Sequence, residues 1–325
     1  MKHTSFPKRT LVVQPLPGIG DMVWFVSYLR ALAAQSPDKK ISLLAKPSSQ
    51  VDRLLDHEGF IDEILWLEPG KSILELLPVL KQCNYTQIWI LHHSPKFALL
   101  AFLAGIPQRY GYGFSWQKFF LTSKNILSKK LKMAHTRLKA SQFLSQHQIA
   151  VQTKDQYLTV DLKAQKRVEE SFKAYPRPWI CLGIGATQAS RRWPNEAFSE
   201  LVALLNKSGG NTVFLSGGPH EAAAALEIQS GVPKQHKKAI PVTHLPLEQT
   251  VALIKMCNFF VGNDSGLMNI SACLGIPTVG LFGQGFTLDY TSNLLAVTPL
   301  KMPARIEDIQ VSQVIELLKS RNLIE

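Results

Sequence analysis

The 325-residue sequence has few cysteines, no long apolar run and, over one long stretch, no acidic residue. Its four cysteines are scattered without a CxxC pair, which excludes a disulfide scaffold and zinc-finger spacing. The longest apolar run, residues 97–106, is about half the length that a membrane span needs. The first residues also lack the apolar core of a signal peptide. We therefore expect a cytoplasmic protein with reduced thiols and no membrane span.

The acid-free stretch, residues 76–154, is called the basic window below. It holds eleven of the 36 basic residues and so accounts for nearly all of the net charge of +12. A field of one sign attracts an anionic partner, which could be nucleic acid, an anionic membrane or an acidic substrate. The simplest alternative is a solvated basic face without a ligand. The residues of the window that we expect to bind an acceptor or a membrane are Arg109, Lys118, Lys129, Lys130 and Lys132.

Short apolar runs alternate with amphipathic segments along the chain, which is typical of α/β proteins with parallel sheets. The alternation stops in the basic window, returns with an expected strand at 157–160, and begins afresh at residue 179. We predict two tandem Rossmann-like, doubly wound domains that face a cleft. Their expected bounds are 1–162 and 179–325, joined by a linker at 163–178. The last helix, near 311–319, is expected to pack back on the N-terminal domain.

The first expected strand, residues 10–16, is followed by Pro17-Gly18-Ile19-Gly20-Asp21, which leads into a helix with Asp21 in its first turn. Asp21 could be a general base aimed at a ligand, or simply an acidic residue favoured by the dipole at a helix start. A dinucleotide fold would need a third glycine three residues after Gly20, where Val23 stands. The loop therefore argues against an NAD site.

Two later loops also join a strand to a helix and carry anion-binding features. One runs from Gly183 to Pro194 and contains Thr187, Arg191 and Arg192; the other spans residues 262–269. Free backbone amides at helix starts and guanidinium groups both suit phosphate oxygens. The arginines could instead be ordinary surface charges.

Between these loops, Glu221 could accept hydrogen bonds from ribose hydroxyls or merely cap its helix. Two phosphate-type loops and one carboxylate in a single α/β domain together suggest a nucleotide diphosphate.

The order of these motifs resembles glycosyltransferase family 9, the lipopolysaccharide heptosyltransferases, and within it the heptosyltransferase II type. The resemblance rests on Gly20-Asp21 before a helix, Arg-Arg-Trp-Pro at 191–194, Gly-Gly-Pro-x-Glu at 217–221 and Asn-Asp-Ser-Gly-Leu-Met at 263–268. It implies a GT-B fold whose N-terminal domain takes the acceptor and whose C-terminal domain takes an ADP-sugar. It further implies metal-independent transfer of heptose from ADP-L-glycero-D-manno-heptose to the lipopolysaccharide inner core, with inversion. No cofactor is expected besides this sugar-nucleotide substrate.

Residue by residue, the resemblance implies that Asp21 is the catalytic aspartate and that Glu221 binds the ribose. Thr187 and Arg191 would bind phosphate. The remaining donor-binding residues that it implies are Asp264, Ser265, Gly266, Leu267 and Asn269.

Two positions depart from the family pattern. Arg191 stands where the family has lysine, so a planar guanidinium with several N–H donors replaces a compact ammonium group. Asn269 stands where the family has histidine, and its amide cannot carry a charge. Three alternatives therefore stay open: another acceptor, such as a protein or another glycan, another sugar nucleotide, or a non-catalytic binding paralogue.

The expected partners are a nucleotide-sugar donor and an acidic, lipid-linked glycan acceptor. A peripheral contact with the inner face of the anionic inner membrane of a Gram-negative cell is also expected. The usual recognition motifs for nucleic acid are missing, so we expect no nucleic-acid partner.

Overall fold

The computed structural model describes residues 9–151, 158–207, 211–233, 239–283, 291–300 and 304–325. The chain divides into two compact units, 1–153 and 154–325, which are called unit 1 and unit 2. One residue of the basic window, Lys154, lies outside the described residues, as does the beginning of the strand expected at 157–160.

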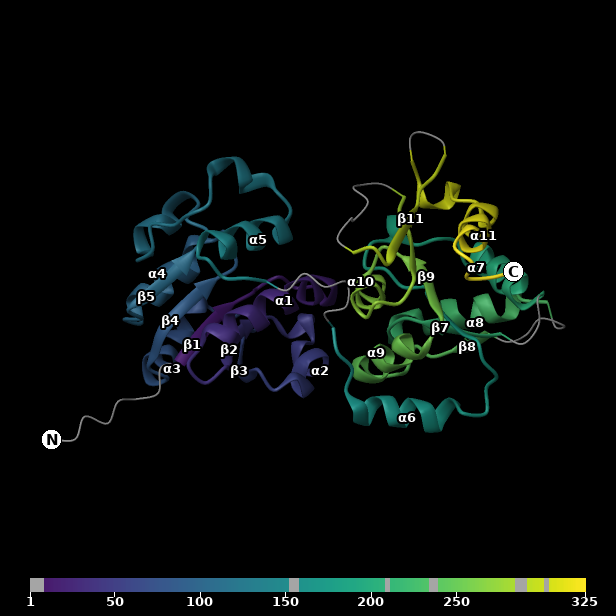
Figure 1. Cartoon of the computed structure of the whole chain (residues 1–325), viewed down its shortest axis with the longest axis horizontal. Coiled ribbons are helices and arrows are strands. Elements are labelled where there is room, and N and C mark those ends of the chain that lie inside the picture. The colour runs from purple at the N-terminus through teal and green to yellow at the C-terminus, as the bar shows by residue number, and fades with distance from the viewer. Residues whose placement is uncertain (1–8, 152–157, 208–210, 234–238, 284–290, 301–303) are drawn as a thin grey trace. The chain divides into compact units, whose positions relative to one another are not determined.

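Unit 1 has a five-stranded parallel sheet in the order β3-β2-β1-β4-β5 (Figure 1). Its strands are β1 (Arg9–Val13), β2 (Ile41–Ala45), β3 (Ile61–Trp66), β4 (Tyr85–Ile90) and β5 (Gln108–Gly111). Its helices are α1 (Ile19–Gln35), α2 (Val51–Leu55), α3 (Leu77–Gln82), α4 (Pro95–Leu103) and α5 (Thr136–Gln146), with the 3₁₀ helices η4 (Ser115–Phe120) and η5 (Lys129–Met133) in the basic window.

Side chains of each central strand alternate between the two faces of this sheet. In β1, Leu11 and Val13 belong to a buried cluster that also contains Phe97 of α4. Val12, between them, is also fully buried, so both faces of the sheet are covered. This double burial explains the continuous apolar runs that predict the strands.

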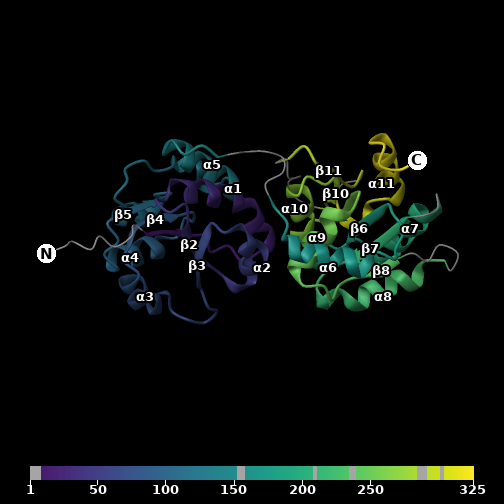
Figure 2. The same cartoon turned by 60° about the horizontal axis from the view of Figure 1, so that its bottom comes forward.

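Unit 2 has a six-stranded parallel sheet in the order β11-β10-β9-β6-β7-β8 (Figures 1 and 2). Its strands are β6 (Trp179–Gly183), β7 (Thr212–Ser216), β8 (Ala239–Pro241), β9 (Phe259–Asn263), β10 (Thr278–Leu281) and β11 (Leu294–Val297). Its helices are α6 (Leu162–Phe172), α7 (Asn195–Lys207), α8 (Ala222–Gly231), α9 (Leu247–Met256), α10 (Gly266–Cys273) and α11 (Val311–Ser320), with η6 (Ala189–Arg191) before α7.

Two of three expectations about the organisation of the chain differ from the structure. The stretch expected to be a linker, 163–178, contains most of α6, which packs against α9 (Figures 1 and 2). The last helix, α11, contributes Val314 and Leu318 to the core of unit 2; its expected packing on the N-terminal domain stays a prediction. Residues 158–160 form no strand. The prediction of two parallel-sheet α/β units is confirmed, and the four cysteines are free thiols.

Candidate functional site

The loops that follow β6 and β9 lie side by side at the carboxyl edge of the sheet of unit 2. These two strands are neighbours, and the chain winds outward from them in opposite directions, through β7 and β8 on one side and β10 and β11 on the other. Such a reversal of strand order is where open α/β sheets bind their ligands. The sheet topology therefore brings together two of the sequence motifs, 184–194 and 263–269.

Asn263, the last residue of β9, ties the two loops together. Its side chain is fully buried. The amide oxygen accepts a hydrogen bond from Trp193 N at 3.0 Å, and the amide nitrogen donates to Ile184 O at 2.7 Å. One side chain thus holds both ends of the 184–193 loop. The motif containing Asn263 is visible in the sequence, but this role is not, because its partners lie 70 and 79 residues away.

Arg191 and Asp264 meet across the two loops. Arg191 Nη1 lies 2.9 Å from Asp264 Oδ2, with the carboxylate more buried than the guanidinium. Burial raises the pKa of the Asp264 carboxyl, while the Arg191 charge lowers it. A guanidinium group has five N–H donors, more than a pair with one carboxylate uses, so Arg191 keeps donors that can serve a ligand anion.

Contacts with Gly218 and with Arg192 of the 184–193 loop fix the carboxylate of Glu221. Its Oε2 accepts a hydrogen bond from Gly218 N at 2.8 Å, and its Oε1 lies 3.5 Å from Arg192 Nη2. A side chain at Gly185 or Gly217 would bring its Cβ within about 3.0 Å of Glu221 atoms. The glycines of these two motifs therefore make room for the carboxylate, which caps the 3₁₀ helix Pro219–Glu221 and, among the described residues, makes no cap hydrogen bond to α8.

The other donor residues expected from the sequence differ in their surroundings. Thr187 is exposed in the loop after β6, and Gly266 and Leu267 begin α10. The hydroxyl of Ser265, the N-cap of α10, is buried and makes no hydrogen bond with the described residues. Asn269 is 4% exposed, and its amide nitrogen donates to Ser265 O at 3.1 Å, one turn back in the same helix.

Asp21 belongs to unit 1, in the first turn of α1. Its Oδ2 accepts a hydrogen bond from Gly18 N at 3.1 Å. Burial raises the pKa of the Asp21 carboxyl; the Gly18 hydrogen bond and the charge of His135 act in the opposite direction. The His135 ring packs edge-on against Trp24, one turn further along α1, at 4.8 Å between centroids. Sequence reasoning missed His135, whose Nδ1 also accepts from Arg137 N at the start of α5.

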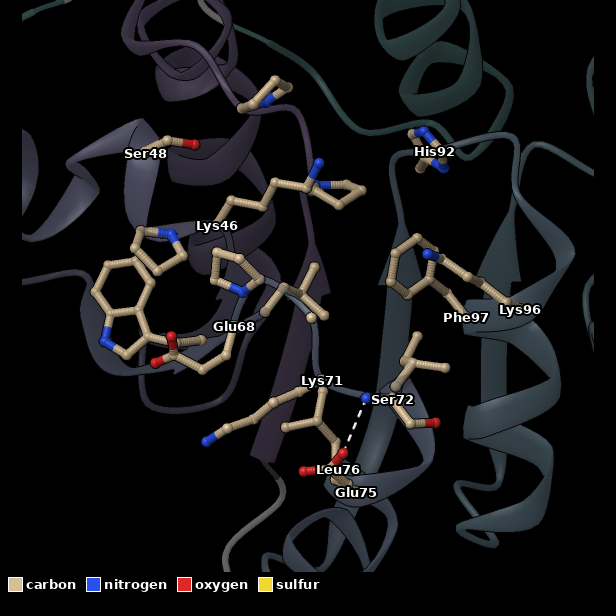
Figure 3. Close-up of a pocket in the computed structure, with 18 residues that line it drawn as sticks. Lys46, Ser48, Glu68, Lys71, Ser72, Glu75, Leu76, His92, Lys96 and Phe97 are labelled. Carbon is tan, nitrogen blue, oxygen red and sulfur yellow. Dashed lines mark hydrogen bonds between the residues drawn. The ribbon is translucent and has the colours of Figure 1, made fainter.

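A pocket of about 730 Å³ lies at the carboxyl edge of the sheet of unit 1 (Figure 3). Pro15 and Pro17, in the segment that leads to Asp21, form part of its wall. Residues that follow β2, β3 and β4 complete it, among them the charged or titratable side chains of Lys46, Glu68, Lys71, Glu75, His92 and Lys96. The sequence did not indicate this pocket because its lining comes from four separate connections.

The electrostatics of this pocket are positive on the β4 side. Burial, together with the nearby charges of His93, Lys96, Lys139 and Lys46, lowers the pKa of His92 to about 4. His92 is therefore neutral near pH 7. Lys46 and Lys96 are left as the cations that a ligand entering beside His92 would meet.

The five expected residues of the basic window are spread over several elements. Arg109 is committed to its own unit: its Nε and Nη1 each donate at 2.6 Å, to Phe120 O and Ile106 O. Lys118 lies on η4, and the remaining three are exposed on η5: Lys129, Lys130 and Lys132. The window is thus a set of basic surfaces rather than one compact site.

Among the residues that the structure describes, no helix combines the length and apolar character that crossing a bilayer requires. In the same residues, no group of three or more His, Cys, Asp or Glu side chains is placed to hold a metal ion.

The family model "Glycosyltransferase family 9 (heptosyltransferase)" matches residues 73–297. Among curated proteins, the chain is 29% identical over 316 residues to lipopolysaccharide heptosyltransferase 2 of Escherichia coli K12, covering 92% of this chain and 87% of that protein. It is 26% identical over 290 residues to lipooligosaccharide heptosyltransferase 2 of Haemophilus influenzae, covering 82% and 80%.

Solved structures agree with these matches. The E. coli ADP-heptose lipopolysaccharide heptosyltransferase II superposes with a TM-score of 0.78 at 26% identity, covering 97% of this chain and 98% of that one. A family 9 glycosyltransferase from Veillonella parvula has the same fold, with a TM-score of 0.81 at 20% identity and 97% coverage of both chains. The expected GT-B fold is confirmed, and the chain belongs to glycosyltransferase family 9, the heptosyltransferases.

Proposed function

We propose that this enzyme transfers heptose from ADP-L-glycero-D-manno-heptose to an acidic, lipid-linked saccharide of the lipopolysaccharide inner core. One observation carries the proposal: the buried Asn263 amide holds the Arg191 loop against the Asp264 loop in a chain similar over 92% of its length to lipopolysaccharide heptosyltransferase 2. This arrangement concentrates cationic and amide donors at one sheet edge, as a diphosphate requires.

In the proposed reaction, Asp21 accepts the proton of the acceptor hydroxyl as that oxygen bonds to the anomeric carbon of the donor. The bond from this carbon to the diphosphate oxygen breaks, its electron pair leaves with ADP, and the anomeric configuration inverts. Arg191, Thr187 and the amides after Asp264 stabilise the charge that develops on the diphosphate, so that no metal ion is required. Electrostatic stabilisation of this kind is usually the largest contribution to catalysis.

We further propose where the remaining substrate groups bind. Glu221 takes the ribose hydroxyls, and the Ser265 hydroxyl, which has no partner among the described residues, donates a hydrogen bond to the sugar nucleotide. The anionic groups of the acceptor enter the pocket of unit 1 beside Lys46 and Lys96, with Lys129, Lys130 and Lys132 adding attraction at longer range. The enzyme would work on the cytoplasmic side of the inner membrane, where the donor and the lipid-linked acceptor meet.

A transfer assay tests this proposal directly. The purified chain is incubated with ADP-heptose and truncated inner-core lipopolysaccharide, and the product is analysed by mass spectrometry. Addition of one heptose supports the proposal. Tight ADP binding by calorimetry without transfer to this acceptor would instead indicate another acceptor or a non-catalytic binding protein.

Replacing Glu221 by alanine should weaken ADP binding by about 1.5–3 kcal/mol, a ten- to hundredfold rise in Kd, if the carboxylate binds the ribose. Titration calorimetry measures this. Gln313→Ala is the matched control, since Gln313 Oε1 caps α11 by accepting from Gln310 N at 2.9 Å, outside the site. If both variants lose similar stability and bind ADP like the wild type, Glu221 is only a helix cap.

Replacing Asn263 by alanine should disturb the site more than the fold. The change leaves Ile184 O and Trp193 N without their buried partner, at a cost of about 1–3 kcal/mol for each group. The 184–193 loop also loses its attachment, so kcat should fall at least tenfold. Steady-state kinetics and thermal melting measure the two effects.

Asn211→Ala is the control for Asn263. Asn211 is another buried amide of unit 2 and donates to Leu205 O at 2.7 Å, away from these loops. The Asn211→Ala variant should lose stability and keep the wild-type kcat. Equal kcat values for the two variants at a temperature where both are folded would contradict a positioning role for Asn263.

A further inference from the structure

Unit 1 exposes a group of large apolar side chains that its own core does not use. Trp116 and Phe119 of η4 are 71% and 69% exposed, and Phe102 and Leu103 at the end of α4 are 52% and 42% exposed. These four residues are called the aromatic patch. Single exposed apolar residues are ordinary, but two exposed aromatic rings on one short helix are not.

Contacts within unit 1 place the two elements that carry the aromatic patch side by side. A 3₁₀ helix has three residues per turn, so Trp116 and Phe119 lie on the same side of η4, with their ring centroids 6.1 Å apart. Helix α4 packs against η4, and the ring of Phe102 lies 5.9 Å from that of Phe120, at the end of η4. The aromatic patch therefore lies on two elements, α4 and η4, that pack against each other.

Basic side chains accompany these rings. Lys118 Nζ lies 5.1 Å from the centre of the Phe119 ring, and Arg109 Cζ lies 5.5 Å from that of Phe102. No acidic residue occurs in the sequence between residues 76 and 154. The patch thus combines exposed aromatic rings with charge of one sign.

We propose that the aromatic patch inserts into the headgroup region of an anionic lipid bilayer. Tryptophan prefers the interface between water and hydrocarbon, and lysine beside it can extend its ammonium toward lipid phosphates. A second copy of the chain is a poorer occupant, because a symmetric contact would bring like charges together. The chemistry of the patch therefore selects an anionic lipid surface.

The position of α4 links this surface to the reaction; this step rests on the proposed function. Lys96 and Phe97, at the start of α4, line the pocket of unit 1 (Figure 3). Phe102 and Leu103 lie at the end of the same helix. Nine residues of helix span about 13 Å. An acceptor sugar attached to a lipid could therefore reach the pocket while its lipid stays in the bilayer that holds the patch.

Sedimentation of the full chain with vesicles tests the inference. The vesicles contain phosphatidylglycerol and phosphatidylcholine in equal parts, with pure phosphatidylcholine as the uncharged comparison. Trp116→Ala/Phe119→Ala should lower the partition coefficient on the anionic vesicles about tenfold or more, because both rings leave the lipid. Lys118→Gln should lower it about fivefold at low salt and hardly at high salt.

Leu162→Ala is the matched control, since Leu162 is a 77% exposed apolar residue of unit 2; it should bind vesicles like the wild type. The double variant should also keep wild-type ADP affinity. The inference is overturned if the wild type does not sediment with anionic vesicles or if the double variant binds them equally well. It is also overturned if the double variant loses only a concentration-dependent dimer. The sedimentation assay contains no sugar donor or acceptor. Its result can therefore be interpreted even if the transfer assay fails.

Discussion

Asp21→Asn should lower kcat by about 10²- to 10⁴-fold, the usual contribution of a general base, with little change in ADP affinity. The side chain keeps its shape and can still accept the hydrogen bond from Gly18 N, but it can no longer take a proton. Steady-state turnover at saturating donor measures the effect. Turnover close to that of the wild type would remove Asp21 from the mechanism.

The same substitution should raise the melting temperature at neutral pH. Burial raises the pKa of Asp21 in the folded protein, so the stability that this group contributes is fully present below its unfolded pKa. That contribution is lost as the pH rises through the folded pKa, and the ionised carboxylate therefore opposes folding near pH 7. The rising limb of kcat/KM against pH should correspondingly lie above about 3.9, the ordinary aspartate pKa.

Asp38→Asn provides a control with the opposite sign. Although burial opposes it, hydrogen bonds from Ser36 Oγ at 2.8 Å and Lys40 N at 3.1 Å lower the pKa of Asp38. Its carboxylate therefore contributes stability above its unfolded pKa, which is lost as the pH falls through the folded pKa. This variant should lose stability at neutral pH and retain kcat.

Arg191→Ala should lower kcat by about 10²- to 10³-fold and weaken ADP binding less, because charge on the diphosphate grows in the transition state. The kcat of Arg191→Lys should lie between those of the alanine variant and the wild type, since lysine keeps the charge but lacks the paired N–H donors of the guanidinium. The measurement is a comparison of kcat with the calorimetric Kd for ADP.

Arg305→Ala is the control for Arg191. Arg305 is also an ion-paired arginine of unit 2, with Nε 3.4 Å from Asp308 Oδ2, but it lies outside the two loops. It should leave kcat unchanged. An Arg191→Ala variant that loses ADP affinity and kcat in equal proportion would indicate that the guanidinium binds the ground state only.

Much of the fold could be predicted because buried parallel strands are continuous apolar runs. The sequence does not predict β5 and β11, because each strand has only four residues and lies at a sheet edge. In addition, β5 begins with the polar residues Gln108 and Arg109. Helix α6 was missed because most of its residues are polar. Its buried residues Ala164, Val168 and Phe172 recur every four positions, and this spacing is the signal that could have found it.

The parts of the candidate site that depend on local sequence motifs could be predicted. Strand-to-helix loops indicate anion binding and so select the two loops, while the family resemblance selects Arg191 and Asp264 within them. That they meet at 2.9 Å, and that Asn263 fixes their loops, depends on β6 and β9 being neighbours in the sheet. The pocket beside Lys46 and Lys96 likewise depends on four connections converging, which no local pattern encodes.

The close approach of β6 and β9 also restricts how this enzyme can diverge. Gly183 and Gly262 are paired in register, and a Cβ on Gly262 would lie 2.6 Å from Gly183 O. A Cβ on Gly183 would collide with the ring of Phe260. A saturation library should therefore retain only glycine at both positions. Relatives with a new donor preference would have to acquire it through substitutions in the 184–193 and 264–269 loops, while the strand ends beneath them stay unchanged.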